Sequence, residues 1–167
     1  MVIKPIVFLL DDSRATLSQG EALLQNNYDV YTSSSADAFF LLLERVFPDV
    51  ILLDVLMPGM DGFDVITKLK ADPRYRDIPV MFLTGKSDSE SERRGFALGA
   101  ADYITKPFSG PLLQKRIETQ LIQRQLESVV NSNAVSKGIA QVLEDVIERL
   151  QQLKASVPCM GESDLIR

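Results

Sequence analysis

Short apolar runs recur along the first 120 residues of the chain, and amphipathic stretches separate them. Because most of these runs are continuously apolar, they are typical of strands buried on both faces of a parallel sheet. The stretch 28–32 predicts a strand at the edge of that sheet. The predicted strands cover residues 6–10, 28–32, 50–53, 80–83 and 103–105.

The stretches between the strands predict helices at residues 13–26, 36–45, 63–71 and 89–98, and a fifth helix begins near Gly110–Pro111. Asp72–Pro73 is expected to end the third helix, and Gly99 is expected to cap the fourth. Five strand–helix units with right-handed crossovers place helices on both faces of the sheet. We therefore predict an α/β fold, a flavodoxin-like doubly wound sheet of five parallel strands with five helices. The strand order is expected to be 2-1-3-4-5, which is the common solution for five such units.

Beyond about residue 120 the pattern predicts helix without strands, which divides the chain into a domain at 1–122 and a helical extension or linker at 123–167. Asn131–Ser132–Asn133 either breaks this helix or lies within it. Apolar residues follow at alternating spacings of four and three, as in a coiled coil. They are Ile139, Leu143, Val146, Leu150, Leu153 and Val157. This seam either packs back on its own domain or forms a parallel coiled coil between two chains.

Four of the predicted strands end directly on polar residues: Asp11–Asp12, Asp54, Thr84 and Lys106. The carboxyl ends of parallel strands share one edge of a sheet, where open α/β folds bind ligands. Each residue also has an ordinary explanation, such as a helix N-cap for Asp11–Asp12 or a surface turn for Lys106. Those explanations require four independent coincidences at four strand ends, so we favour a common site.

The residue types at this edge suit phosphoryl transfer. The carboxylate of Asp54 can attack phosphorus and form an acyl phosphate. Mg²⁺ would neutralise the negative charges, because it accepts carboxylate, water and phosphate oxygens. We expect Asp12 to bind the ion directly, Asp11 to bind through water, and the backbone carbonyl of Leu56 to supply another oxygen.

Lys106 and Thr84 are expected to bind the remaining phosphoryl oxygens, one by charge and one through a hydroxyl donor. Pro107 follows the lysine, and a cis peptide bond between them would aim the lysine inward.

Composition narrows the classes of function. The 167 residues carry a net charge of −5 without a Lys/Arg cluster, so we expect no nucleic-acid partner. One cysteine, Cys159, fits a reducing compartment, and the N-terminal apolar run is too short for a signal peptide or membrane span. We therefore expect a cytoplasmic protein. Histidine is absent, so any phosphohistidine must belong to a partner.

Taken together, Asp11–Asp12, the string LDVLMPGMDG at 53–62, Thr84 and Lys106–Pro107–Phe108 closely resemble the receiver domain of bacterial response regulators, over residues 4–122. The resemblance implies phosphoryl transfer from the phosphohistidine of a partner kinase to Asp54. It also implies that Asp11, Asp12 and Asp54 hold Mg²⁺ and that Thr84 and Lys106 bind the phosphoryl group. Tyr103 matches the aromatic switch of the family, whose ring turns inward as the threonine moves.

On this resemblance the chain is expected to be a signalling module and not an enzyme, catalysing only its own phosphorylation and dephosphorylation. Too few residues follow the receiver for a winged helix or a cyclic-nucleotide enzyme, so it is either a single-domain regulator or a piece of a larger protein. The implied partners are a sensor histidine kinase or phosphotransfer protein, a downstream effector, and a second copy bound through the C-terminal helices. No membrane partner is expected.

Two other functions share parts of this pattern. An aspartyl phosphatase of the haloacid-dehalogenase type also uses a strand-end aspartate, Mg²⁺, a threonine and a lysine. It usually needs a second acid two residues after the nucleophile, where this chain has Leu56. A flavodoxin-like flavin binder would need a Ser/Thr-rich phosphate loop after the first strand, where two aspartates stand instead. We disfavour both.

Overall fold

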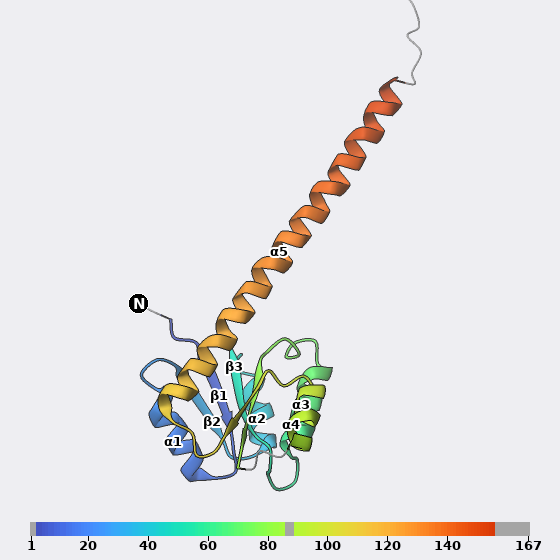
Figure 1. Cartoon of the computed structure of the whole chain (residues 1–167). Coiled ribbons are helices and arrows are strands. Elements are labelled where there is room, and N and C mark those ends of the chain that lie inside the picture. Colours follow the sequence, from blue (N-terminus) through green and yellow to red (C-terminus); the bar gives the residue numbers. More distant parts are fainter. Residues whose placement is uncertain (1–2, 86–88, 156–167) are drawn as a thin grey trace, which may run out of the picture. The chain divides into compact units, whose positions relative to one another are not determined.

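A five-stranded parallel sheet in the order β2-β1-β3-β4-β5 forms the centre of the fold, as predicted (Figure 1). The computed structural model describes residues 3–85 and 89–155. The strands are β1 (Ile6–Leu10), β2 (Asp29–Ser33), β3 (Val50–Asp54), β4 (Val80–Thr84) and β5 (Asp102–Thr105). The middle strands β3 and β4 are buried along their whole length, which explains their continuously apolar sequences.

Helices cover both faces of the sheet, because side chains alternate between the two faces of each strand. The helices are α1 (Arg14–Leu24), α2 (Ala36–Leu43), α3 (Gly62–Ala71), α4 (Ser89–Ala97) and α5 (Gly110–Ala155). One core contains Val7 and Leu9 of β1 with side chains of α1 and α5. The other contains Phe8 and Leu10 with side chains of α2 and α3. These two cores correspond to the predicted doubly wound architecture.

Polar side chains fix the starts of three helices. Ser13 accepts a hydrogen bond from the Thr16 amide at the start of α1, and Ser35 accepts one from the Ala38 amide at the start of α2. Asp61 forms a capping box with Asp64 at α3. Gly99, with φ of +93°, follows α4 in the left-handed conformation expected of a C-terminal glycine.

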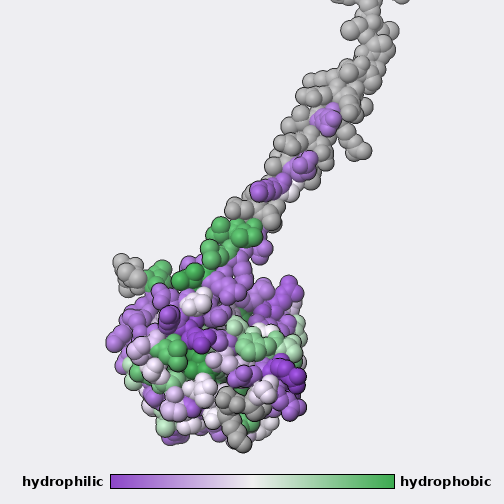
Figure 2. Space-filling model, viewed as in Figure 1, coloured by the Kyte–Doolittle hydropathy of each residue, from purple (hydrophilic) through white to green (hydrophobic). Residues whose placement is uncertain are grey.

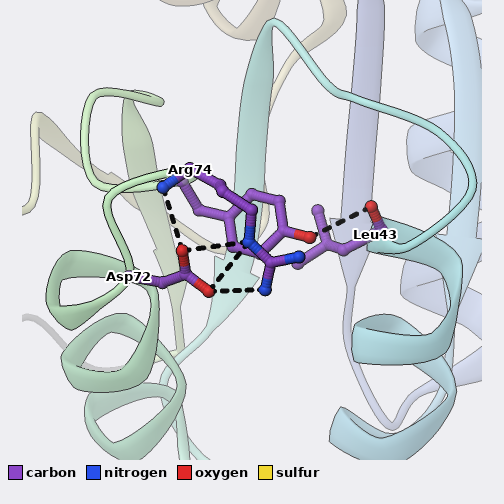
Figure 3. A network of polar contacts seen from close by, with 4 residues as sticks. Leu43, Asp72 and Arg74 are labelled. Carbon is purple, nitrogen blue, oxygen red and sulfur yellow. Dashed lines mark hydrogen bonds and ion pairs between the residues drawn. The ribbon is translucent and has the colours of Figure 1, made fainter.

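The end of α2 is tied to the segment that enters β4 (Figure 3). The Tyr75 hydroxyl donates to the Leu43 carbonyl at 3.4 Å, and the Arg74 guanidinium lies over the Tyr75 ring. Arg74 also donates to Asp72 at 2.7 Å. These contacts connect α2 to the segment between α3 and β4, which leads the chain into the strand that ends at Thr84.

Helix α5 continues through Asn131–Asn133, so these residues lie within the helix and do not break it. By compactness the chain divides into Met1–Arg124 and Gln125–Arg167. On the second unit Leu126, Val129 and Val130 are 61%, 57% and 64% exposed, and hydrophobic surface is visible on this helix in Figure 2. The seam side chains from Ile139 to Val157 lie outside the described part, so the coiled coil stays a prediction.

Within residues 3–85 and 89–155, no helix combines the length and the apolar character required to cross a membrane.

Candidate functional site

Three carboxylates meet at the carboxyl edge of the sheet. Asp11 and Asp12 follow β1, and Asp54 ends β3, whose Leu53 pairs with Leu10 of β1. Each carboxylate offers one oxygen, and these three oxygens all lie within 4.8 Å of one another. Asp11 and Asp54 are 0% and 5% exposed, whereas Asp12 is open to solvent. Such a group can bind a hard cation that enters from the solvent side.

Lys106 joins two of these carboxylates. Its Nζ lies 2.5 Å from Oδ2 of Asp11 and 2.8 Å from Oδ1 of Asp54. The segment that carries it is held to the end of β4, because the Lys106 amide donates to the Thr84 carbonyl at 2.7 Å. The Lys106–Pro107 peptide bond is cis, as predicted. Of the residues predicted at this edge, Asp11 and Asp54 are therefore in direct contact with Lys106.

Backbone groups orient Asp11, and the sequence reasoning missed them. The Ser13 amide donates to Oδ1 of Asp11 at 2.9 Å, so the two oxygens of this carboxylate have different partners. The Asp11 amide in turn donates to the Ser33 carbonyl at the end of β2. The signal in the sequence was the Asp-x-Ser spacing, since aspartate readily accepts from the amide two residues later.

Glycine is required where α3 approaches β3, a second feature that the sequence reasoning missed. A Cβ at Gly62 would overlap the carbonyl oxygen of Asp54, and the Gly62 amide donates to the Val55 carbonyl at 2.9 Å. The Leu56 side chain is 71% exposed beside this turn. That the backbone carbonyl of Leu56 binds the metal ion stays a prediction.

Burial and the neighbouring charges shift the pKa of two groups in this cluster, Asp54 and Lys106. Burial raises the pKa of Asp54, and the nearby Asp11 and Asp12 raise it further, while Lys106 opposes this effect. Burial would lower the pKa of Lys106, but its hydrogen bonds to Asp11 and Asp54 outweigh burial and raise the pKa. The lysine therefore stays charged between its carboxylate partners, and the site favours the arrival of further positive charge.

Thr84 and Tyr103 occupy different places around this cluster. Thr84 is 4% exposed at the end of β4, and its strand neighbour is Thr105, one residue before Lys106. Tyr103 is partly buried on β5, where its hydroxyl donates to the Ser91 carbonyl of α4 at 2.8 Å. Thr84 therefore lies at the same edge as the acids, whereas the Tyr103 side chain extends toward α4.

Residues 7–118 match the family model described as the response regulator receiver domain. The chain belongs to this family. This receiver thus has the fold and the function class that the sequence predicted, a module of two-component signal transduction, and the matches do not favour the phosphatase alternative.

Relatives of known identity support the assignment. The receiver is 39% identical over 74% of its chain to a probable cyclic di-GMP phosphodiesterase of Vibrio cholerae, and 39% identical over 68% to the response regulator PleD of Caulobacter vibrioides. The solved structure of the Vibrio cholerae chemotaxis protein CheY4 is 28% identical, with a TM-score of 0.68. That match covers 71% of this chain and 99% of the other.

The comparisons overturn the prediction that the chain is not an enzyme. The matches cover only 28% and 25% of the phosphodiesterase and of PleD, so this chain spans about a quarter of these relatives. In the first of them a receiver is one part of a longer protein that is named as an enzyme. The chemistry of a receiver does not define what the rest of such a protein does. The exclusion of enzymatic activity was therefore wrong.

Proposed function

We propose that this receiver accepts a phosphoryl group on Asp54 from the phosphohistidine of a sensor histidine kinase or phosphotransfer protein. The observation that carries the proposal is the Asp54 carboxylate itself. It is almost fully buried, bound by Lys106 at one oxygen, and within 4.8 Å of two further carboxylates. In the transfer an Asp54 oxygen forms a bond to phosphorus while the phosphorus–nitrogen bond breaks, and the imidazole of the partner leaves with that electron pair.

The residues present fit Mg²⁺, since Asp11, Asp12 and Asp54 supply three hard oxygen donors beside open solvent. The backbone carbonyl of Leu56 completes the proposed protein ligands. When bound, the ion would neutralise charge between the attacking carboxylate and the phosphoryl group. Lys106 would exchange its contact with Asp54 for a phosphoryl oxygen, and the Thr84 hydroxyl would donate to another.

We infer that phosphorylation shifts the receiver between two arrangements. An aspartyl phosphate adds charge and strong hydrogen-bond acceptors at Asp54. Thr84 and Lys106 can bind these acceptors only when Thr84 moves toward them, and this movement favours the inward place of the Tyr103 ring against α4. The arrangement that makes these contacts gains stability, so its population rises.

The output is proposed to be protein binding. Residues 1–122 would form the receiver and residues 123–167 a helical extension that binds either an effector or a second copy of the chain. Exposed apolar residues on α5, Leu126, Val129 and Val130, support such a contact. A single cysteine supports a cytoplasmic location, where a kinase can supply the phosphoryl group.

Incubation with acetyl phosphate and Mg²⁺, followed by intact-mass measurement, tests the proposal. We expect one phosphoryl adduct on the native chain and none on Asp54→Asn. Asp37→Asn is the matched control, because Asp37 is an exposed aspartate of α2 that does not belong to the group of clustered carboxylates. Undiminished phosphorylation of Asp54→Asn would place the acceptor elsewhere and contradict the proposal.

A further inference from the structure

A buried glycine, Gly95, lies inside α4. Glycine is unfavourable within a helix relative to alanine, so its presence here calls for a reason. The reason is steric: a Cβ at this position would overlap the hydroxyl and ring of Tyr103. The tyrosine ring occupies the volume that any other side chain at position 95 would fill.

Three further contacts hold the Tyr103 ring in this place. Its hydroxyl donates to the Ser91 carbonyl, one turn before Gly95 on α4, at 2.8 Å. Its ring centroid lies 5.1 Å from that of Phe82 and 5.5 Å from that of Phe96. The ring is therefore held by β4 on one side and by α4 on the other, and Gly95 provides the space between them.

Ring contacts continue from this position to the carboxylate site. Phe82 lies two residues before Thr84 on β4, and its ring centroid is 5.4 Å from that of Phe63. Phe63 follows Gly62, the residue that approaches the Asp54 carbonyl. Packed side chains thus join the turn after Asp54, the strand of Thr84, and Tyr103.

The other end of this series reaches the surface. Phe96 of α4 is 50% exposed and contacts the Tyr103 ring. If the tyrosine ring leaves its place, Phe96 loses that support and the surface of α4 changes. The position of the Tyr103 ring therefore determines what α4 presents to a partner.

We infer that Gly95 is a positioning residue of the switch: by having no side chain, it provides the place on α4 into which the Tyr103 ring fits. This inference rests on the proposed phosphorylation function. With alanine at position 95 the ring must move outward and lose its bond to Ser91. If phosphoryl ligands favour the inward ring, the same substitution weakens their binding, because coupling between two sites is reciprocal.

The ring position can be measured directly by ¹⁹F NMR of the full chain labelled with 3-fluorotyrosine. The chain has four tyrosines, and Tyr103→Phe assigns the relevant resonance. We expect Gly95→Ala to move the Tyr103 resonance toward the frequency of an exposed tyrosine. Gly138→Ala is the control, because Gly138 is a helical glycine with nothing near its Cβ position, and it should leave the resonance unchanged.

The coupling is measured as affinity for beryllofluoride, a mimic of the phosphoryl group, in the presence of Mg²⁺. We expect Gly95→Ala to weaken binding by about fivefold or more, and Gly138→Ala to have no effect. In a Tyr103→Ala background the Gly95→Ala effect should vanish, since the ring that it displaces is gone. If Gly95→Ala alone fails to fold while the double variant folds, that result supports the same steric contact.

An unchanged Tyr103 resonance in Gly95→Ala would overturn the inference, and so would an affinity loss that persists without the ring. Failure of the proposed function gives a different result. A native chain that neither binds beryllofluoride nor accepts a phosphoryl group contradicts phosphorylation, and the resonance still reports whether Gly95 positions the ring.

Discussion

Asp54 interacts with charges of both signs, because Lys106 donates to its carboxylate and two further aspartates lie nearby. Its burial and its acidic neighbours make the charged form costly, so its pKa is raised. A cation that binds all three carboxylates would relieve this repulsion. We therefore expect the proposed phosphoryl transfer to depend on a metal ion.

This perturbed aspartate predicts how metal binding depends on pH. We expect Mg²⁺ affinity to fall as the pH is lowered toward the raised pKa of Asp54, because protonation removes the charge that the ion requires. The fall should begin at higher pH than for an ordinary aspartate, since the pKa of Asp54 is raised. Isothermal titration calorimetry at several pH values measures this.

The raised pKa of Asp54 also determines how the stability of the metal-free domain depends on pH. Because the folded state binds this proton more readily than the unfolded state, the metal-free domain gains stability from Asp54 as the pH falls through its raised pKa. Asp54→Asn is the control and should remove this contribution. A metal affinity that is constant over the pH range would contradict the assignment of Asp54 as a ligand.

Individual residues differ in how far the sequence predicts them. The contacts among Asp11, Asp54 and Lys106 follow from parallel strands, whose ends necessarily share one edge. Gly62 and Gly95 could not be assigned in the same way, because their roles arise from close approaches between elements. No spacing in the sequence shows which backbone atom or ring will lie against a glycine.

At the scale of elements, the link between β3 and α3 positions the site. The capping box of Asp61 and Asp64 fixes the first turn of α3, directly after the loop that follows Asp54. The Asp64 amide donates to Asp61 at 2.8 Å. A helix start that is fixed in this way also fixes the course of the preceding loop.

Removal of this cap should therefore destabilise the domain. We expect Asp61→Ala to lower the free energy of unfolding by about 1 kcal/mol, because the Asp64 amide loses its acceptor. Asp61→Asn should retain most of the stability, since asparagine also caps helices well. Urea unfolding of the native chain and of both variants measures these free energies. If Asp61→Ala were as stable as the native chain, the cap would contribute nothing.

The predicted elements agree with the observed ones except near their ends. Helices α1 and α2 are shorter than predicted, and α3 begins at Gly62, one residue before the predicted start. The sequence left open a break at Asn131–Asn133, but α5 continues there. Asparagine and serine are only moderately unfavourable inside a helix, so three such residues do not decide its end.

At the scale of the whole molecule, right-handed crossovers predicted helices on both faces of the sheet, and the common order for five strand–helix units predicted the strand order. The prediction that failed, the absence of enzymatic activity, was drawn from the resemblance of this chain to a receiver. The phosphodiesterase and PleD are about four times longer than the part that matches this chain. Partners and further domains leave no pattern in the receiver sequence, so the sequence alone could not identify them.

Self-association through the C-terminal helix can be tested by truncation. If the predicted seam from Ile139 to Val157 joins two chains, deletion of the residues after Leu126 should lower the number of chains per particle. Light scattering of the full and truncated chains measures this number, and Mg²⁺ binding verifies that the receiver remains folded. The same number of chains per particle before and after truncation would show that the seam does not join two chains.

The central claim is that Asp54 forms the acyl phosphate, and chemical mapping of the phosphorylated chain tests it most directly. Borohydride reduces an aspartyl phosphate to homoserine but leaves phosphate esters of serine, threonine and tyrosine unchanged. After phosphorylation with acetyl phosphate and Mg²⁺, reduction and peptide mass analysis should place homoserine at position 54. Homoserine at another aspartate, or a phosphoryl adduct that yields none, would contradict the account.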